Sequence, residues 1–439
     1  MTQRKSPAKK TLSAAALERE ATKLRERAAL LEMEAIRLSE PAKCQEAACA
    51  ISARKGNVAV FLGAGASRTF GWPLTNQLLP IILDGIVENN LFEDVRRNSK
   101  TDNKKDRELL AAVLNALCPG IELTRTFLAK NESRLPLITS LLSMLDYSLS
   151  SGQSLVSGWS SEQIKTARML LEQAIHETIE YSEKSIADHY WPPREPNRFS
   201  KQLVMWLDTI RRQPTSVGVI TSNYDVAIEK AWGSKRKRMS RVDRLSQSLD
   251  FGFDWIWPSQ TYPEKIIPRP AKPLRRLYKL HGSTNWLRCG LCDRVYIHPM
   301  MDITFIAYER KNTPLRSCHC GHGRMEAQIV SPSFVREMRG PNLISVWQRA
   351  LNWLRKADDW IIIGYSFPDE DLNIRSLFTR ALASRMHWPH VTAVQFGANE
   401  ETRMRYETFF PARHLTFLKG GLEMFLGNAL SAKQLKNCR

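Results

Sequence analysis

Short apolar runs alternate with segments of helical periodicity along most of the chain. Asn57–Leu62 (NVAVFL) is rich in β-branched residues and leads into a glycine turn, a pattern typical of a buried parallel strand. Helical patterns lie between several of the later apolar runs, which favours an α/β fold with a doubly wound parallel sheet. The later runs predicted as strands are Val217–Thr221, Arg276–Leu280, Trp360–Gly364, Val391–Phe396 and, at an edge, Leu415–Leu418.

Residues 11 to 40 predict a long helix with one hydrophobic seam. Leucine and alanine alternate at spacings of four and three from Leu17 to Leu38, as in a coiled coil. Pro41 is expected to end the helix. We therefore predict that residues 1–45 form a coiled-coil segment that joins subunits into a homo-oligomer. The alternative is a single amphipathic helix that docks on its own domain.

Two further segments interrupt the α/β pattern. Residues from about 108 to 190 are mostly helical in pattern and predict a helical insertion. Residues from about 286 to 330 carry Cys289 and Cys292 and then Cys318 and Cys320, and they predict a small module. Two close cysteine pairs fit a tetrahedral structural Zn²⁺, and His319 and His322 are alternative ligands beside the second pair.

Composition indicates a water-soluble globular protein, with 43% hydrophobic and 25% charged residues. No apolar run is as long as a membrane span, and no apolar stretch follows the basic N-terminus, so a cytoplasmic protein without a membrane segment is expected. The net charge of +19 leaves two interpretations open: solvated basic loops, or a surface that contacts nucleic acid. The densest basic spots are Lys235–Arg244 and Lys272–Arg276.

Candidate site residues lie where the predicted strands end. Gly63-Ala-Gly-Ala-Ser67 follows the first strand, and such glycines let the backbone approach a pyrophosphate, although a turn without a ligand is the alternative. Asn223 and Asp225 follow the next strand and point to a ribose and a carboxamide, or else to helix capping. His281 ends a third strand and suits a general base. Gly364 and Ser366 end a fourth.

In this order GAGAS, TSNYD, KLHGS, the paired cysteines, GYS and Asn399 resemble the sirtuin family, over roughly residues 55 to 420. The resemblance implies a sirtuin-like Rossmann domain over residues 50–439, with a six-stranded sheet that binds NAD as substrate and a structural zinc module. It also implies catalytic roles for Asn223 and His281. The residues that it implies for NAD binding are Gly63, Ala64, Gly65, Ser67, Pro73, Thr221, Asp225, Gly364, Ser366 and Asn399.

The chain departs from protein-deacylating sirtuins on the side that holds the protein substrate. Gly71-Trp-Pro-Leu-Thr-Asn76 replaces their Gly-Ile-Pro-Asp-Phe-Arg segment. Ile329–Phe334 replaces their peptide-pairing strand, and Pro332 cannot donate a ladder hydrogen bond. Tyr224 and GYSFPDED further resemble bacterial sirtuin-like NAD hydrolases of anti-phage defence.

The expected activity is therefore NAD hydrolysis to nicotinamide and ADP-ribose. That resemblance also implies control by a phage-sensing partner such as a DNA-translocating ATPase. The alternatives are an NAD-dependent deacylase or ADP-ribosyltransferase, and a non-catalytic NAD or ADP-ribose sensor.

Overall fold

A computed structural model of the chain provides the description that follows. It describes residues 14–54, 56–92, 100–155, 158–185, 197–211, 216–233, 248–258, 265–308, 317–321, 323–330, 340–369, 371–397 and 400–429.

The centre of the molecule is a sheet of seven strands that all run parallel, in the order β12-β11-β10-β1-β2-β6-β3. The predicted doubly wound α/β fold is confirmed. The sheet has one more strand than the resemblance implied, because the two-residue β3 pairs with β6 at the edge. The strands are β1 (Asn57–Leu62), β2 (Ser216–Thr221), β3 (Leu249–Asp250), β6 (Arg275–Lys279), β10 (Asp359–Ile363), β11 (His390–Val394) and β12 (Leu415–Leu418).

The order of the strands reverses between β1 and β10. The chain moves from β1 through β2 to β6 on one side, then returns to β10 and continues outward to β12. In open parallel sheets, ligands bind at the carboxyl ends of the strands beside such a reversal. The turns that follow β1 and β10 therefore mark the expected position of a site.

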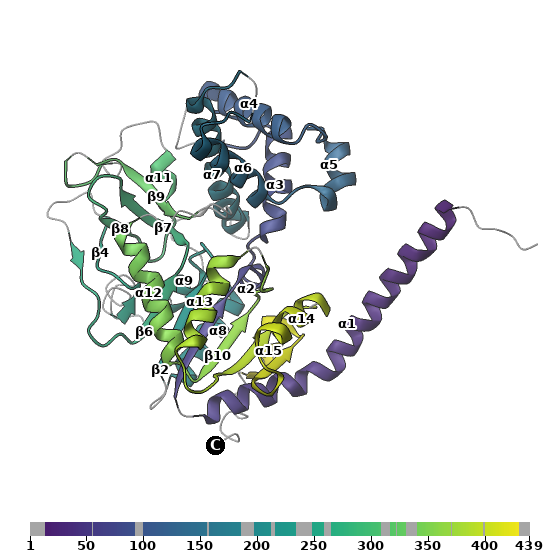
Figure 1. The fold of residues 1–439 in the computed structure, drawn as a ribbon, viewed down its shortest axis with the longest axis vertical. Coiled ribbons are helices and arrows are strands. Elements are labelled where there is room, and N and C mark those ends of the chain that lie inside the picture. The colour runs from purple at the N-terminus through teal and green to yellow at the C-terminus, as the bar shows by residue number, and fades with distance from the viewer. Residues whose placement is uncertain are drawn as a thin grey trace, which may run out of the picture.

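Helices cover both faces of the sheet (Figure 1). On one face, Trp353 of α12 packs against Gly218 of β2 and donates to the Val58 carbonyl oxygen at 3.1 Å. On the other face, Trp206 of α8 and Phe425 of α15 meet edge to face. The flanking helices are α2 (Ala64–Thr69), α8 (Arg198–Ile210), α9 (Ala227–Gly233), α12 (Pro341–Lys356), α13 (Leu372–Ala383), α14 (Glu400–Phe409) and α15 (Gly421–Ala429).

A helical unit stands beside the carboxyl edge of the sheet (Figure 1). Its core is apolar, with Leu110, Leu142 and Leu171 fully buried. The unit begins earlier than the predicted residue 108, because α3 and α4 belong to it. Its helices are α3 (Thr75–Val87), α4 (Lys100–Leu117), α5 (Arg125–Asn131), α6 (Ile138–Ser151) and α7 (Ser161–Ser185).

A second sheet of five strands, in the order β5-β4-β8-β7-β9, carries the cysteines. It reaches further toward the N-terminus than the predicted residues 286–330, because β4 and β5 join it and β7 begins directly after His281. Its elements are β4 (Trp255–Ile256), β5 (Ile266–Ile267), β7 (Gly282–Cys289), β8 (Val295–Ile297), β9 (Met325–Ile329) and the short helix α11 (Phe305–Tyr308).

The N-terminal helix α1 (Ala14–Ala53) has a docked part and a projecting part (Figure 1). The prediction that Pro41 ends this helix is wrong, because Pro41 lies inside it. An internal proline costs about 3 kcal/mol. Burial of the turns that follow offsets this cost, since Cys44, Ala48 and Ile51 are at most 2% exposed.

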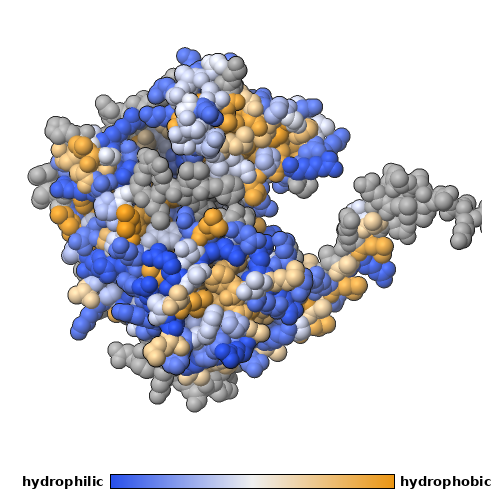
Figure 2. Space-filling view, viewed as in Figure 1, coloured by the Kyte–Doolittle hydropathy of each residue, from blue (hydrophilic) through white to orange (hydrophobic). Residues whose placement is uncertain are grey.

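The segment of α1 before Ser39, which we call the shaft, exposes its apolar seam. Leu24, Leu31 and Leu38 are 62%, 64% and 78% exposed, and Figure 2 shows apolar residues along the projecting helix. The leucine seam therefore does not face its own domain, although Glu32 near the root of the shaft lies 3.9 Å from Lys419. The side chain of Leu17 lies outside the described residues. Among the described helices, none is both long and apolar enough to cross a membrane.

Candidate functional site

A cavity of about 740 Å³ opens at the carboxyl edge of the seven-stranded sheet, beside the reversal of strand order. Gly63 and Thr221 do not line it but lie directly behind its wall, and Asn399 lies outside the described residues. The remaining predicted residues line it together: Ala64, Gly65, Ser67, Pro73, Asn223, Asp225, His281, Gly364 and Ser366.

The glycines at the reversal serve the packing of two turns. A Cβ on Gly63 would lie 2.6 Å from the Gly364 carbonyl oxygen, and one on Gly364 would lie 2.2 Å from the Ala66 nitrogen. Gly364 also has a positive φ of 63°, which favours glycine. Gly65 donates to the Gly364 oxygen at 2.8 Å. These glycines therefore bring the turns after β1 and β10 into backbone contact, which shapes the cavity floor.

Asn223 is held in place from both ends. Its backbone N–H donates to Thr221 Oγ1 at 3.0 Å, and its side-chain Nδ2 donates to the Gly63 carbonyl oxygen at 2.8 Å. Thr221 Oγ1 in turn donates to the Leu62 carbonyl oxygen. Because Nδ2 is engaged with the backbone, the acceptor end of the amide, Oδ1, remains for a hydroxyl group or a water. Gly63 and Thr221 thus hold Asn223 in place from behind the cavity wall.

Asp225 caps the helix α9 and also lines the cavity. Its Oδ1 accepts from the Ala227 N–H at the start of α9, which is helix capping. Its Oδ2 accepts from Ser67 Oγ at 2.5 Å, which ties the turn after β1 to the loop after β2. Asp225 is buried and also lines the cavity. Ser67 and Asp225 therefore form one joined polar surface in the cavity wall.

His281 is buried at the turn between β6 and β7 and is 5% exposed. Its Nδ1 lies 3.2 Å from the Ser222 carbonyl oxygen. A carbonyl oxygen only accepts, so Nδ1 donates this hydrogen bond, and in the neutral form of the ring the lone pair lies on Nε2. The ring has two aromatic neighbours, Tyr224 and Trp347, at centroid distances of 6.3 and 6.2 Å. Both aromatic neighbours fix the orientation of the base.

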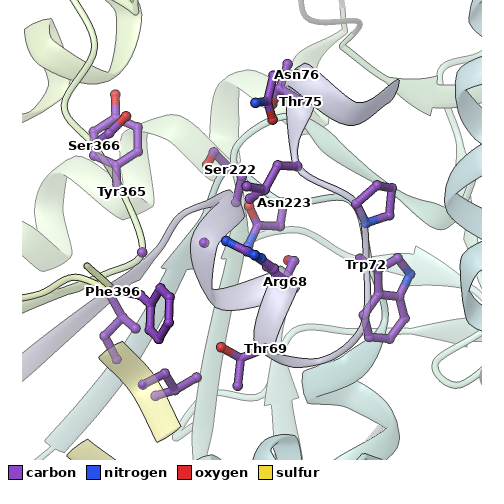
Figure 3. A pocket seen from close by; sticks show the side chains of 18 of the residues that line it. Arg68, Thr69, Trp72, Thr75, Asn76, Ser222, Asn223, Tyr365, Ser366 and Phe396 are labelled. Carbon is purple, nitrogen blue, oxygen red and sulfur yellow. The ribbon is translucent and has the colours of Figure 1, made fainter. Parts of the chain in front are cut away.

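Several wall residues were not predicted. Leu137, Thr139 and Ile179 come from the helical unit, so that unit forms part of the cavity. Figure 3 shows Arg68 within the pocket, and its guanidinium carbon lies 5.9 Å from the centre of the Phe396 ring. Within the described ranges, no carboxylate forms an ion pair with Arg68. Arg68 stands where the usual G-x-G-x-x-G fingerprint has its third glycine, and this is the sequence signal that could have pointed to it.

The four predicted cysteines converge at one end of the second sheet. Their sulfur atoms all lie within 4.8 Å of one another, with 3.8 Å from Cys289 to Cys320 and 3.6 Å from Cys292 to Cys318. Four sulfurs at about 2.3 Å from a tetrahedral zinc ion stand about 3.8 Å apart. The arrangement therefore fits a four-coordinate metal.

The surroundings of the cysteine cluster explain its spacing. A Cβ on Gly323 would lie 1.9 Å from Cys289 Sγ, so only glycine fits there. The ring of His319 stacks on Tyr296 and its Nδ1 lies 3.1 Å from the Tyr296 hydroxyl, which leaves the ligand positions to the cysteines. His322 lies outside the described residues.

The basic spots give little support to a nucleic-acid surface. Lys235–Arg244 lies outside the described residues. In the second spot, Arg275 forms an ion pair with Asp208 at 3.2 Å, and Arg276 stacks over Trp353 at 4.1 Å. Two of its three cations therefore make internal contacts.

One known protein family matches part of the chain that surrounds the cavity. Residues 217–418 match a SIR2-like domain. The matched residues include most of β2, the loop with Asn223, the turn with His281, all four clustered cysteines and β10 to β12. None of the curated proteins matches the chain.

Solved structures of Sir2 enzymes are similar to the chain at low identity. One of them was solved to study the mechanism and regulation of Sir2 enzymes, and it is 14% identical to this chain. The match covers 90% of this chain and 98% of that chain, with a TM-score of 0.40. A complex of a Sir2 homologue with NAD is 12% identical, with 90% and 94% covered and a TM-score of 0.39. Because these values are low, the fold assignment rests on the strand order above.

Proposed function

We propose that the protein binds NAD in this cavity and hydrolyses it to nicotinamide and ADP-ribose. The observation that carries the proposal is the convergence of Asn223 Oδ1, the His281 base and the Ser67–Asp225 surface on one cavity, beside the strand reversal. The match of residues 217–418 to a SIR2-like domain supports it.

The proposed reaction breaks the bond between nicotinamide nitrogen and the ribose C1′. The bonding electrons leave with the nicotinamide, whose positive charge they neutralise, and a water oxygen bonds to C1′. Asn223 Oδ1 would orient a ribose hydroxyl or this water, and His281 Nε2 would take the proton that the water loses. Arg68 would meet the negative charge of the pyrophosphate.

Water is favoured over an acyl-lysine as the acceptor by the sequence departures. Pro332 stands where deacylating sirtuins pair with the peptide, and it cannot donate to a ladder. Pro332 itself lies outside the described residues. The helical unit supplies Leu137 and Ile179 to the cavity wall, and it is the natural element for opening or closing the cavity.

The four cysteines are proposed to hold one Zn²⁺ that stabilises the second sheet. All four ligand positions are filled by sulfur, so the ion would serve structure and leave no position for substrate. β7 links this cluster to the cavity, because it begins next to His281 and ends at Cys289.

The proposed setting is a regulated NAD-depleting effector of bacterial anti-phage defence, in the cytoplasm. The shaft of α1, with its exposed leucines, is proposed to pair with a second copy of the chain. Control by a phage-sensing partner, such as a DNA-translocating ATPase, rests on the family resemblance alone. Full activity of purified protein without partner or nucleic acid would refute external control.

Product analysis tests the activity. Purified protein is incubated with NAD, with and without an acylated peptide, and the products are separated by chromatography. ADP-ribose without peptide supports the hydrolase, and acyl-ADP-ribose formed only with peptide indicates a deacylase. ADP-ribose attached to protein indicates a transferase, and NAD binding without turnover indicates a sensor.

Two variants tie the activity to the cavity. Asn223→Ala and His281→Ala should each lower the rate by more than tenfold, which corresponds to about 1.4 kcal/mol of barrier. Asn57→Ala and His298→Gln are matched controls, because Asn57 begins β1 at the opposite edge of the sheet and His298 lies outside the cavity. A cavity variant that keeps more than about a tenth of the rate removes that residue from catalysis.

A further inference from the structure

A buried ion pair lies beneath the loop that carries Asn223, outside the cavity itself. The side chains of Lys279 on β6 and Glu229 on α9 are each 1% exposed, and Lys279 Nζ lies 3.0 Å from Glu229 Oε1. Neither residue lines the cavity. A charged pair so deeply buried has a desolvation penalty that its mutual attraction often fails to repay.

The hydrogen bonds of Lys279 show what the ammonium group joins. It has three protons to donate. Its shortest contacts are the Asp225 carbonyl oxygen at 2.5 Å, Ser283 Oγ at 2.5 Å and Glu229 Oε1 at 3.0 Å, with the Tyr224 carbonyl oxygen further away at 3.4 Å. One cation therefore connects the loop after β2, the start of β7 and the helix α9.

The two candidate catalytic residues stand on either side of this connection. Asp225 follows Asn223 by two residues, and His281 follows Lys279 by two residues. Ser283 reinforces the link, because its Oγ donates to the Tyr224 carbonyl oxygen at 3.0 Å. The separation of Asn223 and His281 is therefore set across Lys279.

The pair is not arranged for stability alone. Within the described part of the chain, the second carboxylate oxygen, Glu229 Oε2, has no hydrogen-bond partner. Apolar side chains of similar volume often stabilise a core as well as a buried ion pair does. They would not, however, fix the two carbonyl groups of the loop, which require a donor.

We propose that Lys279, oriented by Glu229, is a positioning residue that sets the geometry between Asn223 and His281. The proposal rests on the proposed function for its catalytic meaning, although the connection itself can be measured without turnover. Misplacement by about 1 Å of a catalytic group lowers rates by up to about 100-fold. We call the hydrogen bonds from Lys279 to Asp225, Ser283 and Glu229 the clamp. Loss of the clamp is therefore expected to lower kcat and to leave the KM for NAD nearly unchanged.

The test compares Lys279→Met, Glu229→Gln and the double variant Lys279→Met/Glu229→Leu with wild type. The double variant matters because Lys279→Met alone leaves Glu229 buried without its cation, whereas the double variant restores an apolar pair and should fold. Lys279→Met and the double variant should lose about 10- to 100-fold in kcat. Glu229→Gln keeps a hydrogen-bonding oxygen and should lose less.

A matched control separates positioning from stability. Arg54 and Asp359 form another ion pair, 2.5 Å apart, at the amino end of β10 and away from the cavity. Arg54→Met should lower the melting temperature and keep kcat. A kcat of the folded double variant within twofold of wild type overturns the proposal, and so does an equal fall in kcat for Arg54→Met.

Hydrogen exchange tests the clamp independently of activity. In Lys279→Met and the double variant, amides of residues 222–228 and 280–286 should exchange about tenfold faster, with β1 and β10 unchanged. Unchanged exchange in both segments overturns the clamp. If wild type binds NAD but releases no nicotinamide, the proposed function fails while this measurement still decides on the clamp.

Discussion

Replacement of Gly323 by alanine should abolish binding of the proposed zinc ion at the cysteine cluster. The added Cβ would lie 1.9 Å from Cys289 Sγ and 3.2 Å from Cys320 Sγ. Carbon and sulfur pack no closer than roughly 3.5 Å, so Cys289 Sγ must move by about 1.5 Å. Metal–ligand distances tolerate only about 0.2 Å. The substitution therefore removes one of four ligands without touching a cysteine.

The size of the effect follows from the affinity of such sites. Structural zinc contributes about 10–16 kcal/mol of apparent binding free energy, so one of four sulfurs carries on the order of 3 kcal/mol. A loss of roughly 3 kcal/mol lowers the melting temperature by several degrees. Elemental analysis of Gly323→Ala should give well under one zinc per chain, with a lower melting temperature than wild type.

Gly321→Ala is the matched control. Gly321 has a φ of +83°, but a Cβ there would meet no atom within 4 Å. Alanine at this position costs about 1–2 kcal/mol of backbone strain and leaves the sulfurs in place. It should keep one zinc per chain. Full zinc occupancy in Gly323→Ala, or an equal loss of zinc in Gly321→Ala, would refute the packing argument.

Three further predictions concern the cavity, pH and assembly. Arg68→Ala should raise the KM for NAD with little change in kcat, whereas an unchanged KM in steady-state kinetics would exclude Arg68 from pyrophosphate binding. Burial, with Lys230 nearby, lowers the pKa of His298 to about 4 from 6.5. The unfolded chain then takes up a proton that the folded chain resists, so stability falls by roughly 3 kcal/mol between pH 6.5 and 4. Urea titrations should show a flatter pH profile for His298→Gln, and identical slopes would contradict this. Deletion of residues 1–38 should lower the number of subunits per particle in light scattering and keep the domain folded, because Glu40 is the first buried residue among those described; an unchanged number of subunits would rule out pairing through the shaft.

The sequence predicted the parts of this molecule in which local pattern and final structure agree. The five later strands were each predicted to within two residues at either end, because buried parallel strands are continuous apolar runs. The four cysteines converge because one pair lies at the end of β7 and the other precedes β9, and these two strands are paired. Asn223 and His281 share a cavity because the carboxyl ends of parallel strands meet at one edge.

Other features depended on contacts between distant segments. Pro41 does not end α1, since tertiary burial of Cys44 and Ile51 outweighs the local cost of proline. The two-residue strands β3 and β4 carry too little pattern to be recognised, so the extra edge strand was missed and the cysteine module was predicted to begin too late. The supporting roles of Gly63 and Thr221, and the connection through Lys279, require three-dimensional geometry.

The docked end of α1 connects the shaft to the wall of the cavity. Glu40 accepts a hydrogen bond from the Lys419 backbone N–H at 2.6 Å, and two residues later Gly421 begins α15 and lines the cavity. From Glu40 to Ala14 the helix is about 40 Å long. A tilt of one degree at Glu40 therefore moves the end at Ala14 by roughly 0.7 Å. If the shaft pairs with a second copy as proposed, a tilt of the shaft would move the cavity wall at Gly421.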